Sequence, residues 1–258
     1  MMTLWTAFAH TDDYPFDVAS VKKYWDRLHA GDKEPLPKSA KVLAAWALFH
    51  SGEFQKAVEA GLKAGPAGIT VANKAACVYA NYLEPKEKVK QSLFMEVATR
   101  AAAQAAAEPT NANAFYWQGY ALGRYSQGIS VAKALAQGIG GKVKTAFETA
   151  IQLQPDHADA YIGLAAFHAE VIDKVGTLIG NMTYGAKKDT SLKLFQLGLE
   201  LTQKSTVAMI EYANALVILE GEKRLDEATR LYEQVAAASA LDAMERLDVE
   251  LAQAELAD

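Results

Sequence analysis

The sequence predicts an all-α protein in which about 10 to 12 helices stack as antiparallel pairs into a right-handed superhelix, a solenoid over residues 1–258. Apolar residues recur at helical spacing, and the alternation typical of β-strands does not persist beyond a few residues. Small residues also recur where the two helices of a pair would cross, namely at Ala45, Ala57, Gly119, Ala165 and Ala228.

The first half of the chain is expected to form one N-terminal helix and two helix pairs. Asp17 can begin the first helix, because its carboxylate accepts hydrogen bonds from the free N–H groups of the first turn. Gly52 marks the turn inside the first pair, and Pro85 ends the first helix of the second pair. The expected elements are a helix at about 17–30 and pairs at about 38–64 and 69–108.

The second half is expected to form three further pairs and a last helix. In the third pair, Gly119 follows the aromatic residues of its first helix, and Pro155 ends the second helix. The last helix is amphipathic, so it is expected to cap the open end of the stack with a charged outer face. The expected elements are pairs at about 112–155, 157–203 and 205–238 and a capping helix at about 241–256.

Two successive pairs are longer than a plain repeat. The third and the fourth each carry about a dozen extra residues between their two helices, at 126–141 and 175–188. Both insertions are apolar and contain glycine. Insertions on one face of a solenoid commonly serve binding, so we expect them to be functional.

Parts of the chain resemble the tetratricopeptide repeat (TPR), a helix-turn-helix module whose members mostly bind peptides or proteins. The resemblance lies in residues 38–64, 111–155 and 225–235. The central half, from FYWQGYALGRYSQGIS through AIQLQPDHADAYIGLA to YGAKKDTSLKLFQLGLEL, resembles a narrower group that contains the T-component proteins of TRAP transporters and the regulators of microtubule dynamics. This resemblance implies a degenerate repeat fold with lengthened central helices.

Charge and hydropathy exclude several classes of partner. The net charge is −5 and acidic and basic residues are interspersed, so nucleic acid is not an expected partner. Asp173, Lys174 and Glu211 interrupt the most apolar stretches, so no membrane span is expected. The first residues lack the basic and apolar regions of a signal peptide, which predicts a cytoplasmic protein, or a periplasmic one if a leader has been removed.

No constellation of catalytic or metal-binding residues is recognisable, so we expect neither an enzyme nor a cofactor. The glycines before Lys142 lack the strand and the Ser or Thr of a phosphate loop, since Val143 follows the lysine. No two histidines have the spacing of a zinc-binding helix, and His157 is expected to be solvated. The single cysteine, Cys77, lies in an apolar stretch and is expected to be a buried thiol.

The concave face of such a solenoid is formed mainly by residues spaced by about four on the first helix of each pair. This spacing selects Asn113, Tyr116, Tyr120 and Arg124 in the third pair and Asp159, Ile162 and Glu170 in the fourth. Tyrosine and arginine are common in binding hot spots, so these residues are the candidate binding surface. In the alternative interpretation, the tyrosines pack against the insertions and Arg124 pairs with Glu170.

Two functions agree with these observations. The first is a non-enzymatic scaffold whose concave groove binds a peptide or a protein segment. The second is a small-ligand-binding accessory protein, in which the two insertions close the solenoid around a cavity as in a TRAP T-component. An open groove with polar walls would favour a peptide, and an enclosed apolar pocket would favour a small ligand. The sequence does not indicate an oligomeric state.

Overall fold

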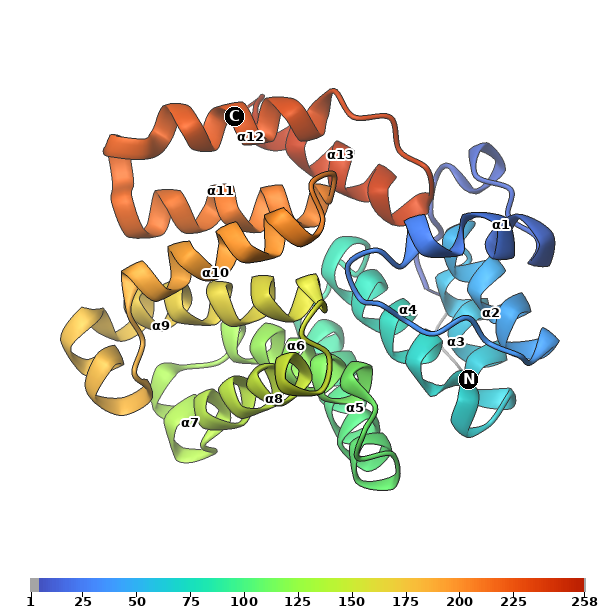
Figure 1. The fold of residues 1–258 in the computed structure, drawn as a ribbon, viewed down its shortest axis with the longest axis horizontal. Coiled ribbons are helices and arrows are strands. Elements are labelled where there is room, and N and C mark those ends of the chain that lie inside the picture. Colours follow the sequence, from blue (N-terminus) through green and yellow to red (C-terminus); the bar gives the residue numbers. More distant parts are fainter. Residues whose placement is uncertain (1–4, 258) are drawn as a thin grey trace.

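The computed structural model describes residues 5–257, which form thirteen α-helices, three short 3₁₀ turns and no strand. The chain pairs its helices antiparallel in sequence order and stacks the pairs into a curved solenoid (Figure 1). The helices are α1 (Val18–Leu28), α2 (Ala40–His50), α3 (Phe54–Lys63), α4 (Ile69–Tyr82), α5 (Glu87–Ala107), α6 (Ala112–Gln127), α7 (Val131–Ala136), α8 (Ile139–Leu153), α9 (Ala158–Tyr184), α10 (Lys188–Leu201), α11 (Thr206–Glu220), α12 (Leu225–Ala236) and α13 (Ala243–Glu255).

The ends of the first elements follow from local chemistry. Asp17 caps α1 as expected: its carboxylate accepts a 2.7 Å hydrogen bond from the backbone N–H of Ser20. The Ser20 hydroxyl in turn accepts from the N–H of Asp17, which completes a capping box. Gly52 turns the chain between α2 and α3 with φ of +83°, a conformation in which a Cβ would be strained.

The small residues lie at the predicted helix crossings. Ala45, Ala57 and Ala165 are fully buried. In the third pair, Gly119 of α6 faces the ring of Phe147 from α8: a Cβ at Gly119 would lie 3.1 Å from that ring. Gly163 of α9 also faces this ring, and a Cβ there would lie 2.5 Å away from it. The absence of two side chains therefore makes room for one phenyl ring between three helices.

The two insertions have different structures. The first is a loop followed by the short helix α7, which the hydroxyl of Ser130 caps. The second continues α9 through a sharp turn at Gly176, where φ is +80° and ψ is 160°, and ends at Tyr184. After this turn the helix folds back on itself, because Gly180 packs against Val171, where a Cβ would lie 3.0 Å from the Val171 side chain. Both central pairs are thus lengthened, as predicted.

The last helix does more than cover the last pair. It packs on α11 and α12, as a capping helix should, and it also contacts α2 near the other end of the chain. Ala243 and Leu247 belong to the same apolar cluster as Trp46 and Phe49 of α2. Figure 1 shows α13 beside α1, and an ion pair joins these two helices, so the two ends of the solenoid meet.

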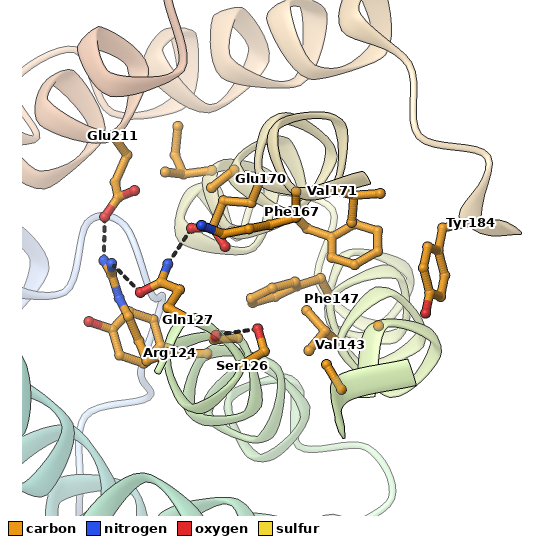
Figure 2. A pocket seen from close by; sticks show the side chains of 18 of the residues that line it. Arg124, Ser126, Gln127, Val143, Phe147, Phe167, Glu170, Val171, Tyr184 and Glu211 are labelled. Carbon is orange, nitrogen blue, oxygen red and sulfur yellow. Dashed lines mark hydrogen bonds and ion pairs between the residues drawn. The ribbon is translucent and has the colours of Figure 1, made fainter. Parts of the chain in front are cut away.

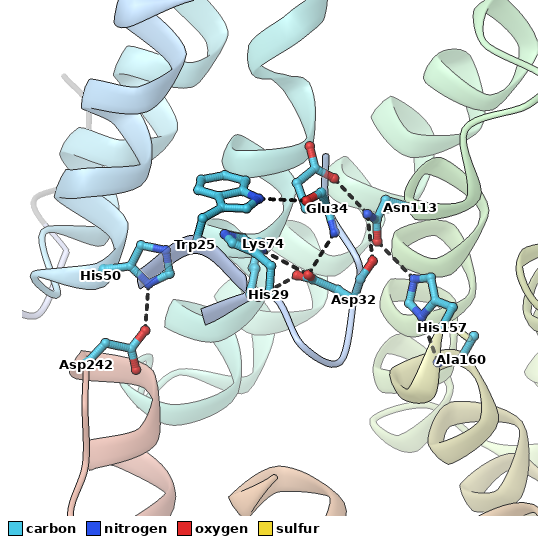
Figure 3. A network of polar contacts seen from close by, with 10 residues as sticks. All are labelled: Trp25, His29, Asp32, Glu34, His50, Lys74, Asn113, His157, Ala160 and Asp242. Carbon is cyan, nitrogen blue, oxygen red and sulfur yellow. Dashed lines mark hydrogen bonds and ion pairs between the residues drawn. The ribbon is translucent and has the colours of Figure 1, made fainter. Parts of the chain in front are cut away.

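A buried polar network holds the loop after α1 against the helices around it (Figure 3). The Asp32 carboxylate lies 2.9 Å from Nδ1 of His29 and accepts a 2.7 Å hydrogen bond from Nζ of Lys74. The side-chain amide of Asn113 donates to the Asp32 carbonyl and to the Glu34 carboxylate. Buried charges require such partners, so these contacts fix the loop against α4 and α6.

Candidate binding pocket

A pocket of about 150 Å³ lies between α6, α8 and α9, beside both insertions. It is built where the lengthened pairs depart from a plain repeat. Residues that line it include Tyr116, Tyr120, Gly123, Arg124, Ile129, Leu135, Val143, Phe147, Ile162, Phe167, Glu170, Val171, Tyr184 and Glu211.

One side of the pocket is apolar. Figure 2 shows Val143, Phe147, Phe167 and Val171 directed toward the same space, with Tyr184 closing its far side. Tyr184 comes from the second insertion and packs on Gly140 of α8, where a Cβ would lie 2.8 Å from its ring. Its ring also meets the ring of Phe167 edge to face, with centroids 6.0 Å apart. The second insertion therefore supplies part of the apolar wall.

The other side carries a continuous chain of polar contacts (Figure 2). The Arg124 guanidinium donates to the carboxylate of Glu211 from α11 and, at 3.4 Å, to the side-chain oxygen of Gln127. The Gln127 amide donates in turn to the carboxylate of Glu170. The guanidinium also lies over the ring of Tyr120, 5.2 Å from its centroid, a favourable cation–π geometry. Three helices thus contribute to one polar edge.

Burial changes the titration of this polar edge. It raises the pKa of Glu170 to about 7, although the neighbouring Arg124 acts in the opposite direction. Burial, together with the charge of Asp32, raises the pKa of Asp159 to about 7 as well. Near neutral pH these two carboxyl groups can therefore donate as well as accept hydrogen bonds, whereas Arg124 stays charged.

Six of the seven predicted surface residues line this pocket, namely Tyr116, Tyr120, Arg124, Asp159, Ile162 and Glu170. Asn113 does not line it. Its side chain is buried in the network around Asp32, and its oxygen lies 3.0 Å from Nε2 of His157. Of the four predicted residues on α6, the first, Asn113, is therefore buried, and the other three line the pocket.

The alternative interpretation predicted an ion pair between Arg124 and Glu170, and this prediction is wrong. Arg124 pairs with Glu211 from the fifth pair, and Glu170 hydrogen-bonds to Gln127 instead. The expectation of a solvated His157 is also wrong: this side chain is fully buried and caps α9, accepting a 3.2 Å hydrogen bond from the N–H of Ala160. Cys77 is fully buried, as predicted, and burial raises the pKa of its thiol.

Several pocket residues were not identified from the sequence. Glu211 carried a signal, because it is the one charged side chain within the long apolar stretch at the centre of α11. Val143, Phe147 and Phe167 carried none, since their spacing is that of ordinary core residues. They line the pocket together with residues of both insertions, such as Leu135 and Tyr184.

A second hollow of about 500 Å³ lies between α9, α11 and α12 and adjoins the pocket. Arg124, Gln127, Glu170 and Glu211 line both hollows, so the polar edge of the pocket also borders the second hollow. Beyond this edge the second hollow is lined by half-exposed apolar side chains, those of Val217, Ile218 and Leu225. The two hollows therefore lie side by side, with the four shared side chains at their boundary.

Two further structural tests bear on function. Within residues 5–257, no three His, Cys, Asp or Glu side chains converge in a way that could hold a metal ion. In the same part of the chain, no helix combines the length and hydropathy needed to cross a bilayer.

Comparison with known proteins supports the fold. No protein-family model and no curated protein matches the sequence. Among solved structures, the chain is similar to a thermophilic TPR protein of Thermus thermophilus, with a TM-score of 0.59 and 14% sequence identity. The match covers 83% of this chain and 97% of that protein. At this identity the likeness shows a TPR-like helical solenoid.

Proposed function

We propose that the chain is a non-enzymatic binding protein that takes up a segment of a partner protein by seating one apolar side chain in the pocket between α6, α8 and α9. The observation that carries this proposal is the division of the pocket into an apolar wall and a polar edge, and this edge also lines the neighbouring hollow. A TPR-like solenoid supports it, because grooves of this fold commonly bind extended or helical segments.

The size of the pocket suits a single side chain. A dry cavity of about 150 Å³ can hold a molecule the size of benzene, which is close to the side chain of Phe or Leu. Burying such a side chain is worth about 1.5 to 3 kcal/mol. The rest of the segment would lie over the polar edge, where Arg124, Gln127 and Glu170 offer hydrogen bonds to its main chain.

Selection from a random peptide library displayed on phage tests this proposal, because the method does not require the partner to be identified first. The selected peptides should share one large apolar residue at a fixed position. A synthetic peptide with that residue changed to Ala should bind at least about tenfold more weakly. A library that yields no binder, or binders without a common apolar residue, would contradict the proposal.

A second candidate is a small-ligand-binding protein, because residues of both insertions line the apolar wall. The resemblance of the central half to T-component proteins of TRAP transporters supports this candidate. Native mass spectrometry of freshly purified protein distinguishes the two functions. A retained apolar metabolite that peptides cannot displace would favour the small ligand, and its absence together with peptide binding would favour the scaffold.

A further inference from the structure

The helical segment after the turn at Gly176 exposes three large apolar side chains. Leu178, Ile179 and Met182 are 74%, 56% and 79% exposed, and they are not part of the pocket wall. Residues four apart lie on one face of a helix, so Leu178 and Met182 project together, with Ile179 beside them. We call these three residues the apolar tip.

The segment packs on the rest of the molecule without using the apolar tip. Its inward face is formed by Gly180, which is buried against Val171, and by Tyr184, which packs on Gly140. A helix that only had to cover the core would turn its large apolar residues inward. In this segment a glycine faces inward and the large apolar residues face outward, so covering the core does not explain the exposure of the apolar tip.

The surroundings of the apolar tip are basic. Residues 125–147 and 174–188, which contain both insertions, hold six lysines and no Asp or Glu. The other residues hold 20 of the 26 basic side chains and all 31 acidic ones, which gives them a net charge of −11. Figure 1 shows α7 and the end of α9 at the same edge of the molecule, away from α1 and the N-terminal pairs.

Several of these lysines have no carboxylate to neutralise them. Among the described residues, Lys133, Lys142 and Lys187 make no ion pair, and all three are exposed. Leu135 of α7, 47% exposed, adds a further apolar side chain at this edge. The edge therefore combines protruding apolar groups with unpaired positive charge on an otherwise acidic protein.

We infer that this edge docks on a membrane surface rich in anionic lipids, with Leu178, Ile179 and Met182 entering the headgroup region and the lysines contacting lipid phosphates and carboxylates. Amphipathic surface segments bind membranes through this combination of apolar insertion and basic charge. The apolar tip protrudes, whereas a site for a peptide would be concave. The acidic remainder of the molecule would be repelled by the same lipids, which fixes the orientation of docking.

Sedimentation with vesicles tests the inference. The full chain should sediment with vesicles of phosphatidylcholine and phosphatidylserine and stay in solution with phosphatidylcholine alone. Leu178→Asn combined with Met182→Asn should lower the partition coefficient at least about tenfold, because two large apolar groups are lost. Lys133→Gln and Lys142→Gln should each lower it about fivefold.

The matched control is Leu36→Asn combined with Leu62→Asn, two leucines that are 50% and 45% exposed far from the insertions, and it should bind like the original chain.

The outcomes separate membrane docking from other contacts. Far-UV circular dichroism and melting temperature should be the same for all variants, since every changed side chain is at least partly exposed. The inference is wrong if the original chain does not bind anionic vesicles. It is equally wrong if the variant changed at Leu178 and Met182 binds them as strongly as the original chain. It is also wrong if that variant changes only the oligomeric state in the absence of vesicles, because the apolar tip would then join copies of the chain.

Discussion

The Asp242 carboxylate lies 2.6 Å from Nδ1 of His50, although 192 residues separate the two in the sequence. Asp242 caps α13 through the N–H of Glu245, so the same carboxylate begins the last helix and contacts the first pair. Nearby, Asp248 accepts hydrogen bonds from Tyr82 of α4 and from Thr206 of α11. These buried contacts join the two ends of the solenoid.

Removing this contact should cost more than removing an ordinary helix cap. Asp242→Ala loses the cap and leaves the buried His50 without its partner, so we expect the free energy of unfolding to fall by about 2 to 4 kcal/mol. The control is Ser205→Ala, which removes the cap of α11 alone and should cost about 1 kcal/mol. Chemical denaturation measures both. Equal losses would show that the contact between the chain ends contributes nothing.

Substitution of either glycine that faces Phe147 should destabilise the fold, whereas substitution of Gly123 on α6 should not. In Gly163→Ala the new Cβ would lie 2.5 Å from the Phe147 ring, so the three helices must separate, at a cost of about 1 to 3 kcal/mol. Gly119→Leu should cost a similar amount for the same reason. Gly123→Ala is the control, because its Cβ would approach only Val143, at 4.0 Å, and Ala favours helix by about 1 kcal/mol. Thermal melting measures these effects. A melting temperature of Gly163→Ala equal to or higher than that of Gly123→Ala would contradict this packing.

The buried ring of His157 should make stability depend on pH. Burial lowers its pKa to about 4, whereas the unfolded chain takes up this proton near pH 6.5. Between these values the unfolded state binds more protons, so the free energy of unfolding falls as the pH falls. His157→Asn keeps a residue that can cap α9 and removes the titration. The stability advantage of the original chain over this variant should therefore shrink by up to about 3 kcal/mol from pH 7 to pH 4, and a constant difference would show that His157 does not titrate in this way.

Much of the fold could be predicted from local chemistry and repeat spacing. Ala45 and Ala57 marked a helix crossing because only small side chains allow two backbones to approach closely. The spacing of Tyr116, Tyr120 and Arg124 placed them on one face of α6, and that face borders the pocket. Spacing within one helix is fixed by its geometry, so such inferences need no knowledge of the rest of the chain.

Contacts between distant elements could not be predicted in the same way. The pairing of Arg124 with Glu211 depends on how far α11 is displaced from α6, which the lengthened pairs determine. The direction of the second insertion depends on the positive φ of Gly176, and a sequence shows only that glycine permits it. The burial of His157 could not be predicted from its neighbours in the sequence, two aspartates, because it depends on the distant loop after α1, which packs against the start of α9.

If the pocket between α6, α8 and α9 seats an apolar side chain of the partner, a side chain that fills the pocket must weaken binding. Gly123→Leu tests this directly, because Gly123 lines the pocket and its Cβ would enter nearly open space. Gly141→Leu is the matched control, since a Cβ at Gly141 in α8 meets nothing within 4 Å and this residue does not line the pocket. The measurement is calorimetric titration of each variant with a peptide selected on the original chain. We predict that Gly123→Leu raises Kd by about tenfold to a hundredfold without lowering the melting temperature, while Gly141→Leu leaves Kd unchanged. Unchanged affinity in Gly123→Leu would contradict the proposed seating of the side chain.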